Sequence, residues 1–189
     1  MDTLLKKIFK GIEIPEADLA EFGFNEHCYQ AYYALAMLLQ PKYILEIGTY
    51  RGYALIALAA GAKSIEYITS IDNEVMLKDS QDIAYLNLRK SGYKKPAILY
   101  KADSLGIEVQ STIEQTKFDF IHIDGKHTFD SAYADLHWSK QLLNIGGVIL
   151  MHDYSNPEVK QATDKFLLET GLEGICLDSF YRKAVLISK

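Results

Sequence analysis

The feature that most constrains the fold is the run Tyr43–Ala59, which reads as a buried strand, a glycine turn and an apolar helix. The strand is apolar except for Glu46, a pattern typical of a parallel strand that ends at a functional carboxylate. Gly48 and Gly52 then bracket three residues before the helix. Such a turn brings backbone N–H groups and a helix N-terminus close to a polar ligand. The run therefore predicts a cofactor site that includes Glu46, Gly48, Thr49 and Gly52.

The spacing of this turn argues against a nicotinamide dinucleotide as the ligand. The dinucleotide fingerprint is G-x-G-x-x-G, whereas this chain has Glu46, one residue, Gly48, three residues and Gly52. At these residues the chain resembles the first motif of class I S-adenosylmethionine-dependent methyltransferases, in which the glycine turn passes under the methionine end of the cofactor. The resemblance implies S-adenosylmethionine as the cofactor, and a tight turn without a ligand is the alternative.

The second strand, expected at Ile65–Ile71, is followed by Asp72 and Asn73. In nucleotide-binding folds an acid at this place binds the ribose, because a carboxylate accepts two hydrogen bonds from a vicinal diol. We therefore assign Asp72, with Asn73 beside it, to the cofactor. The alternative is that Asp72 caps the N-terminus of a helix expected over Val75–Lys90.

The third strand, Ala97–Tyr100, leads to Asp103 and Ser104. The methyltransferase resemblance implies that an acid after this strand contacts the adenine amino group, which assigns Asp103, with Ser104 next to it, to the cofactor. Asp-Ser is equally an N-cap pair for a helix over Leu105–Thr116. Both readings stay open.

The other expected elements complete an alternation of strands and helices, in which Pro15 and the acids after it form a connector. They are helices over residues 1–10 and 25–40, a fourth strand over 118–125, a helix through Asn144 that is broken by Gly146–Gly147, a fifth strand Val148–Met151, a helix from Asn156 to Thr170, and short strands Glu173–Asp178 and Ala184–Ser188.

Five strands that alternate with helices require an α/β fold, a Rossmann-like, doubly wound parallel sheet with helices on both faces. The resemblance implies the strand order 3-2-1-4-5, and the last two strands form an antiparallel pair. The carboxyl ends of parallel strands meet at one edge of the sheet, where ligands bind. That edge gathers the acids that end or follow the five strands, which are Glu46, Asp72, Asp103, Asp124 and Asp153.

Composition restricts the class of protein further. At 189 residues, with 49% hydrophobic and 24% charged residues, the chain fits one globular domain, an N-terminal helical segment at 1–40 and a Rossmann-like core at 41–189. A net charge of −5 gives no basic surface for nucleic acid. The longest apolar run, Ala31–Leu39, is too short to cross a bilayer, and no signal-peptide pattern opens the chain. Cys28 and Cys176 suggest neither a disulfide nor a metal site. We expect a cytoplasmic protein without a membrane partner, and a homodimer.

The segment from Asp124-Gly125 to His152-Asp153 most resembles the small macrocin- and catechol-type O-methyltransferases. In metal-dependent relatives a divalent cation is held by an acid after strand four and by two ligands after strand five. Asp124, His152 and Asp153 match these places, which implies a site for a cation such as Mg²⁺ or Mn²⁺. The alternative is that Asp124 caps a loop while His152 and Asp153 form a structural pair.

Two residues compete for the role of catalytic base. His127 follows Asp124 by three residues, and an unperturbed imidazole titrates near neutral pH. Lys126 stands where many relatives carry an acid, and its amine would need burial or a nearby cation to lower its pKa.

Three functions are consistent with these residues. The first is S-adenosylmethionine-dependent methylation of an oxygen on a small hydroxylated molecule, with help from a divalent cation. The second is methylation of nitrogen or of a macromolecule without a metal. The third is a non-catalytic nucleotide-binding module, because a fold does not fix a function.

Overall fold

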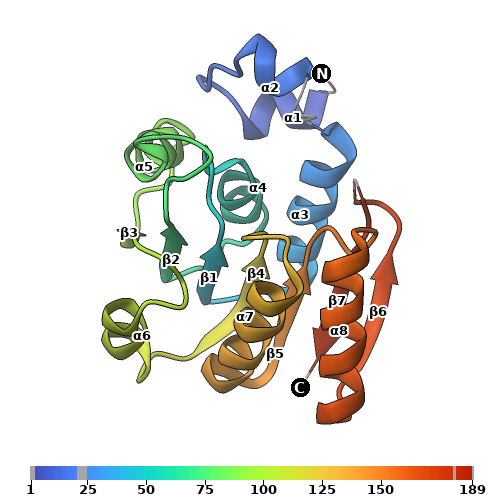
Figure 1. Cartoon of the computed structure of the whole chain (residues 1–189). Helices are drawn as coiled ribbons and strands as arrows, with labels where there is room; N and C mark the ends of the chain where they lie inside the picture. Colours follow the sequence, from blue (N-terminus) through green and yellow to red (C-terminus); the bar gives the residue numbers. More distant parts are fainter. Residues whose placement is uncertain (1–2, 21–24, 181, 189) are drawn as a thin grey trace.

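The computed structural model describes residues 3–20, 25–180 and 182–188 of the chain. A seven-stranded sheet in the order β3-β2-β1-β4-β5-β7-β6 forms its centre (Figure 1). Strands β1 to β5 pair in parallel, and β7 and β6 add an antiparallel end. The expected Rossmann-like class, the order 3-2-1-4-5 and the antiparallel ending are confirmed. The strands are β1 Tyr43–Ile47, β2 Tyr67–Asp72, β3 Ala97–Lys101, β4 Phe118–Ile123, β5 Leu143–Met151, β6 Glu173–Leu177 and β7 Ala184–Ser188.

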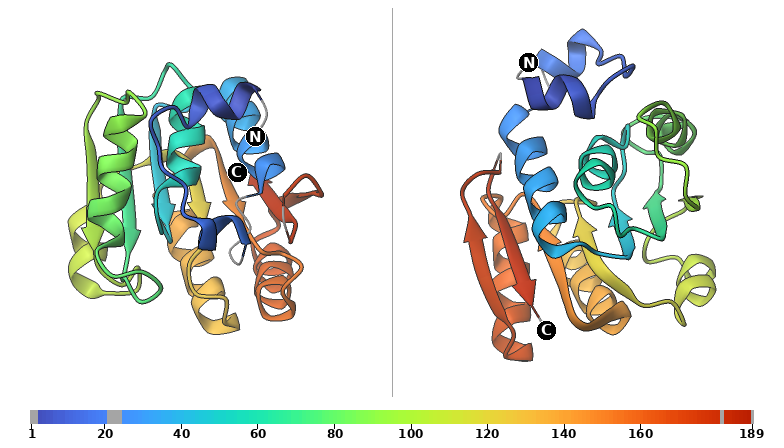
Figure 2. Two further views of the ribbon diagram at one scale, coloured as in Figure 1. Left: turned by 90° about the horizontal axis from the view of Figure 1, so that it is seen from above. Right: turned by 180° about the vertical axis from the view of Figure 1, so that it is seen from behind.

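Helices cover both faces of the sheet (Figure 2). Helices α1, α3, α4 and α5 contribute to one buried apolar cluster, and α6, α7 and α8 contribute to the other. Among the described helices, none combines the length and the apolar character that spanning a membrane requires. The helices are α1 Thr3–Ile8, α2 Glu16–Ala20, α3 Glu26–Leu39, α4 Tyr53–Gly61, α5 Ser80–Lys90, α6 Ile107–Ile113, α7 Phe129–Leu142 and α8 Pro157–Thr170.

The two-residue period of a strand decides which side chains of the central strands face which helices. In β1, Ile44 belongs to the cluster that contains α3 and α4, whereas Leu45 belongs to the cluster that contains α7. Glu46 therefore points to the same face as Ile44. Its partner in register on β4 is His122, so the two polar side chains lie side by side under α3.

The segment after β2 differs from the expectation. Helix α5 begins at Ser80 and not at Val75. Backbone N–H groups that a helix would use are taken locally, because Asp72 Oδ1 accepts from Glu74 N at 2.6 Å and Asn73 Oδ1 accepts from Val75 N at 3.2 Å. Glu74 also has a left-handed backbone, with φ +60°, which a helix cannot include. The alternative role of Asp72 as a helix N-cap is therefore wrong.

The connection between α7 and β5 also differs. The helix ends at Leu142, and Gly146–Gly147 lie inside the strand rather than breaking the helix. The pairing of β4 with β5 shifts register between Phe118 and Phe120, which is the signature of a β-bulge. A Cβ on Gly147 would lie 3.1 Å from the carbonyl oxygen of Asp119. Gly147 therefore allows the two strands to approach closely, whereas a Cβ on Gly146 would meet nothing within 4 Å.

Two shorter helices complete the corrections. The expected connector after Pro15 contains the helix α2. The helix expected over Leu105–Thr116 is shorter, and its N-cap is Gly106. Asp103 instead accepts a hydrogen bond from Leu105 N at 2.9 Å inside the preceding turn, so the N-cap reading of Asp103-Ser104 is wrong. Among the described residues, neither Cys28 nor Cys176 forms a disulfide.

Candidate active site

The glycine turn after β1 packs directly against the loop after β4. Gly48 has φ +86°, and a Cβ placed on it would lie 2.0 Å from the carbonyl oxygen of Asp124 and 2.9 Å from Gly125 N. Sequence reasoning expected Gly48 to make room for a ligand. In the structure, the missing side chain makes room for the backbone of the neighbouring loop.

Asp72 organises the same turn. Its Oδ2 accepts hydrogen bonds from the backbone N–H groups of Thr49 at 2.8 Å and Tyr50 at 2.9 Å, and its Oδ1 accepts from Glu74. A carboxylate offers about four acceptor positions. The N–H groups of the described residues fill three of them and leave one on Oδ1 for a ligand. Asp72 can thus accept one ribose hydroxyl, rather than both hydroxyls of a diol through two open oxygens.

The residues assigned to the adenine side follow the carboxyl ends of β2 and β3. Asn73 and Asp103 are exposed, and Ser104 is half-buried. The hydroxyl of Ser104 donates to Asp135 Oδ1 on α7 at 2.7 Å. Asp135 is buried, and burial raises its pKa to about 6. Sequence reasoning missed Asp135, although an acid on the stripe of buried positions of α7 was a signal for it.

Glu46, which was expected to contact the cofactor, is instead buried, with only 1% of it exposed. His122 Nδ1 lies 3.1 Å from Glu46 Oε1, and Ser70 Oγ donates to Glu46 Oε2 at 3.4 Å. Tyr32 of α3 is the last residue of this chain of polar contacts, with its hydroxyl 2.7 Å from His122 Nε2. Burial raises the pKa of Glu46 well above its ordinary value and lowers the pKa of His122 to about 4. The pair is therefore neutral overall inside the sheet, and it joins α3 to the strand that carries the glycine turn.

Three residues from two neighbouring strands converge beside Gly48. One ligand atom from each of Asp124, His152 and Asp153 lies within 4.8 Å of the others. His152 Nδ1 is 3.5 Å from Asp124 Oδ1 and 3.6 Å from Asp153 Oδ1. Because β4 and β5 are parallel neighbours, the residues that follow them meet at the same edge of the sheet. The three residues assigned to a metal from the sequence are thus brought together.

The cluster fits a divalent cation. His152 Nδ1 is buried and has no hydrogen-bond partner among the residues that the structure describes, although buried polar atoms are normally satisfied. It faces two carboxylates, and two oxygens with one imidazole nitrogen suit Mn²⁺ and tolerate Mg²⁺. Burial opposes ionisation of Asp124, but His152 and His127 hold the pKa of its carboxyl well below the ordinary value. Asp124 is therefore a carboxylate, as a metal ligand must be.

His127 lies closer to the cluster than its position in the sequence suggested. Its Nε2 is 2.8 Å from Asp153 Oδ2 and 3.4 Å from Asp124 Oδ1. Hydrogen bonds to Asp124 and Asp153 raise the pKa of His127 to about 9. Without a cation, His127 is therefore an imidazolium near neutral pH, and the expectation of an unperturbed imidazole is wrong. Lys126 is exposed to solvent.

Two surface hollows lie at different distances from the cluster of Asp124, His152 and Asp153. One, of about 270 Å³, is lined by Asn25, His27, Asp178, Ser179 and Phe180. The ring of Phe180 meets that of His152 edge to face at 5.9 Å, so this hollow borders the cluster.

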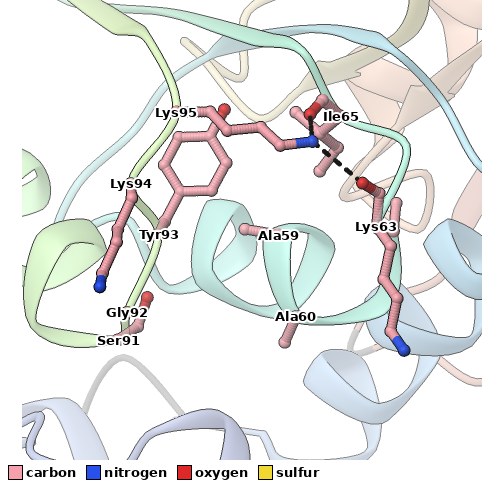
Figure 3. Close-up of a pocket in the computed structure, with 10 residues that line it drawn as sticks. Ala59, Ala60, Lys63, Ile65, Ser91, Gly92, Tyr93, Lys94 and Lys95 are labelled. Atoms are coloured by element: carbon pink, nitrogen blue, oxygen red, sulfur yellow. Dashed lines mark hydrogen bonds between the residues drawn. The ribbon is translucent and has the colours of Figure 1, made fainter.

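The other hollow, of about 380 Å³, lies between the ends of α4 and α5 (Figure 3). Lys95 Nζ there donates to the carbonyl oxygens of Lys63, at 3.0 Å, and Ile65. This ammonium group satisfies carbonyl groups after the end of α4, which is a structural role.

Comparison with known proteins identifies the family. A family model described as a methyltransferase domain matches residues 45–154, which run from β1 to the residues that follow β5. The chain belongs to this methyltransferase family. The sequence-based assignment to the class I S-adenosylmethionine-dependent methyltransferases is thereby confirmed.

Three individual relatives and solved structures share between 19% and 26% of their aligned residues with this chain. A curated Arabidopsis thaliana protein, named provisionally as a caffeoyl-CoA O-methyltransferase, is 26% identical over 116 residues, which are 61% of this chain and 47% of the relative. The chain thus spans about half the length of that relative. An O-methyltransferase from Bacillus cereus, solved with S-adenosylhomocysteine, is 20% identical with a TM-score of 0.70, over 92% of this chain and 86% of the other. TomG from Streptomyces achromogenes, solved with S-adenosylmethionine, is 19% identical with a TM-score of 0.68, over 100% and 91%. At these identities the structures establish the methyltransferase fold.

Proposed function

We propose that this methyltransferase family member transfers the methyl group of S-adenosylmethionine to an oxygen of a small hydroxylated molecule, with a divalent cation held by Asp124, His152 and Asp153. One observation carries the proposal. The glycine turn and the cluster share a boundary, because Gly48 packs against the backbone of Asp124. A donor on the turn and an acceptor on the cluster would then be neighbours, and placing two reactants side by side supplies much of the rate of an in-line displacement.

Different residues are proposed to bind the methyl donor and the methyl acceptor. Asp72 holds the amides of the turn and offers its remaining acceptor position to the ribose. Asp103 after β3 is proposed for the adenine amino group, with Asn73 and Ser104 beside it. A bound cation would lower the pKa of the acceptor hydroxyl. The hollow lined by Asn25, His27 and Phe180 is proposed for the acceptor, because it offers polar side chains such as those of Asn25 and His27 and borders His152 through Phe180.

His127 is the proposed base. Its raised pKa comes from Asp124 and Asp153. Once these carboxylates share a cation, they attract the imidazolium proton less strongly. His127 can then be neutral and accept the proton of the acceptor hydroxyl. Lys126 at the adjoining position is the competitor, but its side chain is exposed to solvent.

The first test replaces Asp72 with Ala and measures binding of S-adenosylmethionine by calorimetry. The variant loses a ligand contact and the oxygen that accepts two backbone hydrogen bonds from the turn, so binding should weaken by roughly 1.5–3 kcal/mol, as expected for hydrogen bonds to a charged group. Glu114→Gln, an exposed charge change on another loop, should bind like the wild type. Equal affinity of the Asp72 variant and the wild type would remove Asp72 from the cofactor site.

The second test compares His127→Ala with Lys126→Ala in an assay for S-adenosylhomocysteine production with Mn²⁺ or Mg²⁺. We expect His127→Ala to lower turnover on the order of 10²–10⁴-fold, as for loss of a general base, while Mn²⁺ still binds. Lys126→Ala should keep most of its activity. The reverse pattern would transfer the base role to Lys126.

Broader expectations belong to the same proposal. A protein of this charge and fold would act on a small molecule and not on nucleic acid, in the cytoplasm, as one domain and as a homodimer. Undiminished turnover after exhaustive chelation would favour the metal-independent alternative. Failure to bind S-adenosylmethionine would favour the non-catalytic module.

A further inference from the structure

The N-terminal segment makes a buried contact with the glycine turn. Asp18 of α2 is only 2% exposed. Its Oδ1 accepts a hydrogen bond from the hydroxyl of Tyr50 at 2.8 Å, and its Oδ2 accepts one from the hydroxyl of Tyr53 at 2.7 Å. Arg51 Nε forms an ion pair with Oδ2 at 2.9 Å. One acidic side chain thus contacts three residues of the turn and of the start of α4.

Burial of this carboxylate depends on the conformation of the turn. A buried charge is tolerated only when it is paired and hydrogen-bonded. The three contacts of Asp18 come from residues 50 to 53, so the charge is compensated only while these residues keep their arrangement. Figure 1 shows α2 beyond the carboxyl ends of β1 and β2, the end of the sheet at which the glycine turn follows β1.

The turn itself has a backbone that needs such support. Tyr50 has φ +51° and Gly52 has φ +76°, and a left-handed backbone is unfavourable for a residue with a side chain. Asp72 holds Tyr50 through its backbone N–H, and Asp18 holds it through its hydroxyl. Two carboxylates, that of Asp18 before the turn in the sequence and that of Asp72 after it, therefore hold Tyr50 in place.

We propose that Asp18 is a positioning residue of the cofactor site, and that α2 is a clamp that holds the turn of residues 49–52 in its ligand-binding conformation. This inference rests on the proposed function, because the ligand of the turn is taken to be S-adenosylmethionine or its product. Since coupling between two sites is reciprocal, a ligand on the turn also strengthens the docking of α2.

The experiment measures binding of S-adenosylhomocysteine to the full chain by calorimetry. Asp18→Asn keeps the shape of the side chain but loses its charge and one of its two acceptor oxygens. We expect this variant to bind S-adenosylhomocysteine about 10- to 100-fold more weakly, from the loss of hydrogen bonds to a charged group. Glu16→Gln removes an exposed charge from the same helix and should leave the affinity unchanged.

A second readout separates positioning from simple stabilisation. Bound S-adenosylhomocysteine should slow amide hydrogen exchange in residues 16–20 of the wild type and not in Asp18→Asn. A variant with a lower unfolding temperature but wild-type affinity would overturn the inference, because Asp18 would then be structural.

Two further outcomes stay interpretable. If Asp18→Asn does not fold, Tyr50→Phe removes one hydrogen bond and keeps the ion pair with Arg51. Its affinity should fall roughly 3- to 10-fold, in line with loss of a single hydrogen bond, and an unchanged affinity would overturn the inference. If the wild type itself does not bind S-adenosylhomocysteine, the proposed function fails, and the inference fails with it.

Discussion

Replacement of Gly48 with Ala should destabilise the whole protein by roughly 3–5 kcal/mol, a large part of the stability of a typical domain. The added Cβ would lie 2.0 Å from the carbonyl oxygen of Asp124. Backbone cannot move aside as the end of a flexible side chain can, so β1 and the loop after β4 must separate. The φ of +86° adds strain of its own. Urea denaturation measures the change.

Gly171→Ala is the matched control for this experiment. Gly171 also has a left-handed backbone, with φ +65°, but a Cβ on it would meet nothing within 4 Å. It should therefore lose only about 1 kcal/mol, the conformational part of the penalty. Similar losses in the two variants would mean that Gly48 is not packed against Asp124 and that the turn and the cluster are not in contact.

Replacement of Asp124 or Asp153 with Asn should reduce turnover about 10³-fold or more and abolish its dependence on a divalent cation. Each change removes one of two carboxylates that face His152 Nδ1, and electrostatic assistance by a metal contributes several kcal/mol to such a reaction. Binding of S-adenosylmethionine should persist, because the proposed cofactor contacts follow β1, β2 and β3.

Three measurements check this expectation together. Calorimetry with Mn²⁺ alone and with S-adenosylmethionine alone separates the two sites, and a coupled assay for S-adenosylhomocysteine gives the turnover. Asp130→Asn changes an exposed acid on α7 and should match the wild type in all three. A variant of Asp124 or Asp153 with full turnover after chelation would favour the alternative, in which Asp124 caps a loop and His152 and Asp153 form a structural pair.

The site predicts a close link between metal and proton. Asp124 and Asp153 raise the pKa of His127 to about 9. Burial lowers the pKa of His152, but the same carboxylates outweigh burial and raise that pKa well above its ordinary value. The protons on these imidazoles thus interact with the same carboxylates that a cation would bind. Cation binding should therefore release protons and strengthen as pH rises, because metal and proton compete for the same ligands.

The sequence by itself determined the fold class and the place of the site. A buried apolar strand followed by Gly48 and Gly52 has few structural solutions, and alternating strands and helices fix a parallel sheet. In such a sheet the residue after each strand reaches the same edge. Asp124, His152 and Asp153 could therefore be grouped without coordinates, because the methyltransferase resemblance implied the strand order that makes β4 and β5 neighbours.

The tertiary structure alone decided which polar side chains pair, since contacts across long stretches of chain leave no periodic signal in a sequence. Glu46 and His122 are 76 residues apart, and Tyr32 and His122 are 90 residues apart. Glu46 was expected to contact the cofactor, but the register of β1 with β4 places it beside the buried His122. Asp18 accepts a hydrogen bond from Tyr50, 32 residues further along the chain. It lies on α2, a helix that is too short to show a hydrophobic periodicity in the sequence. Burial and neighbouring charges then set the pKa of each group, and these arise only when the segments are packed together.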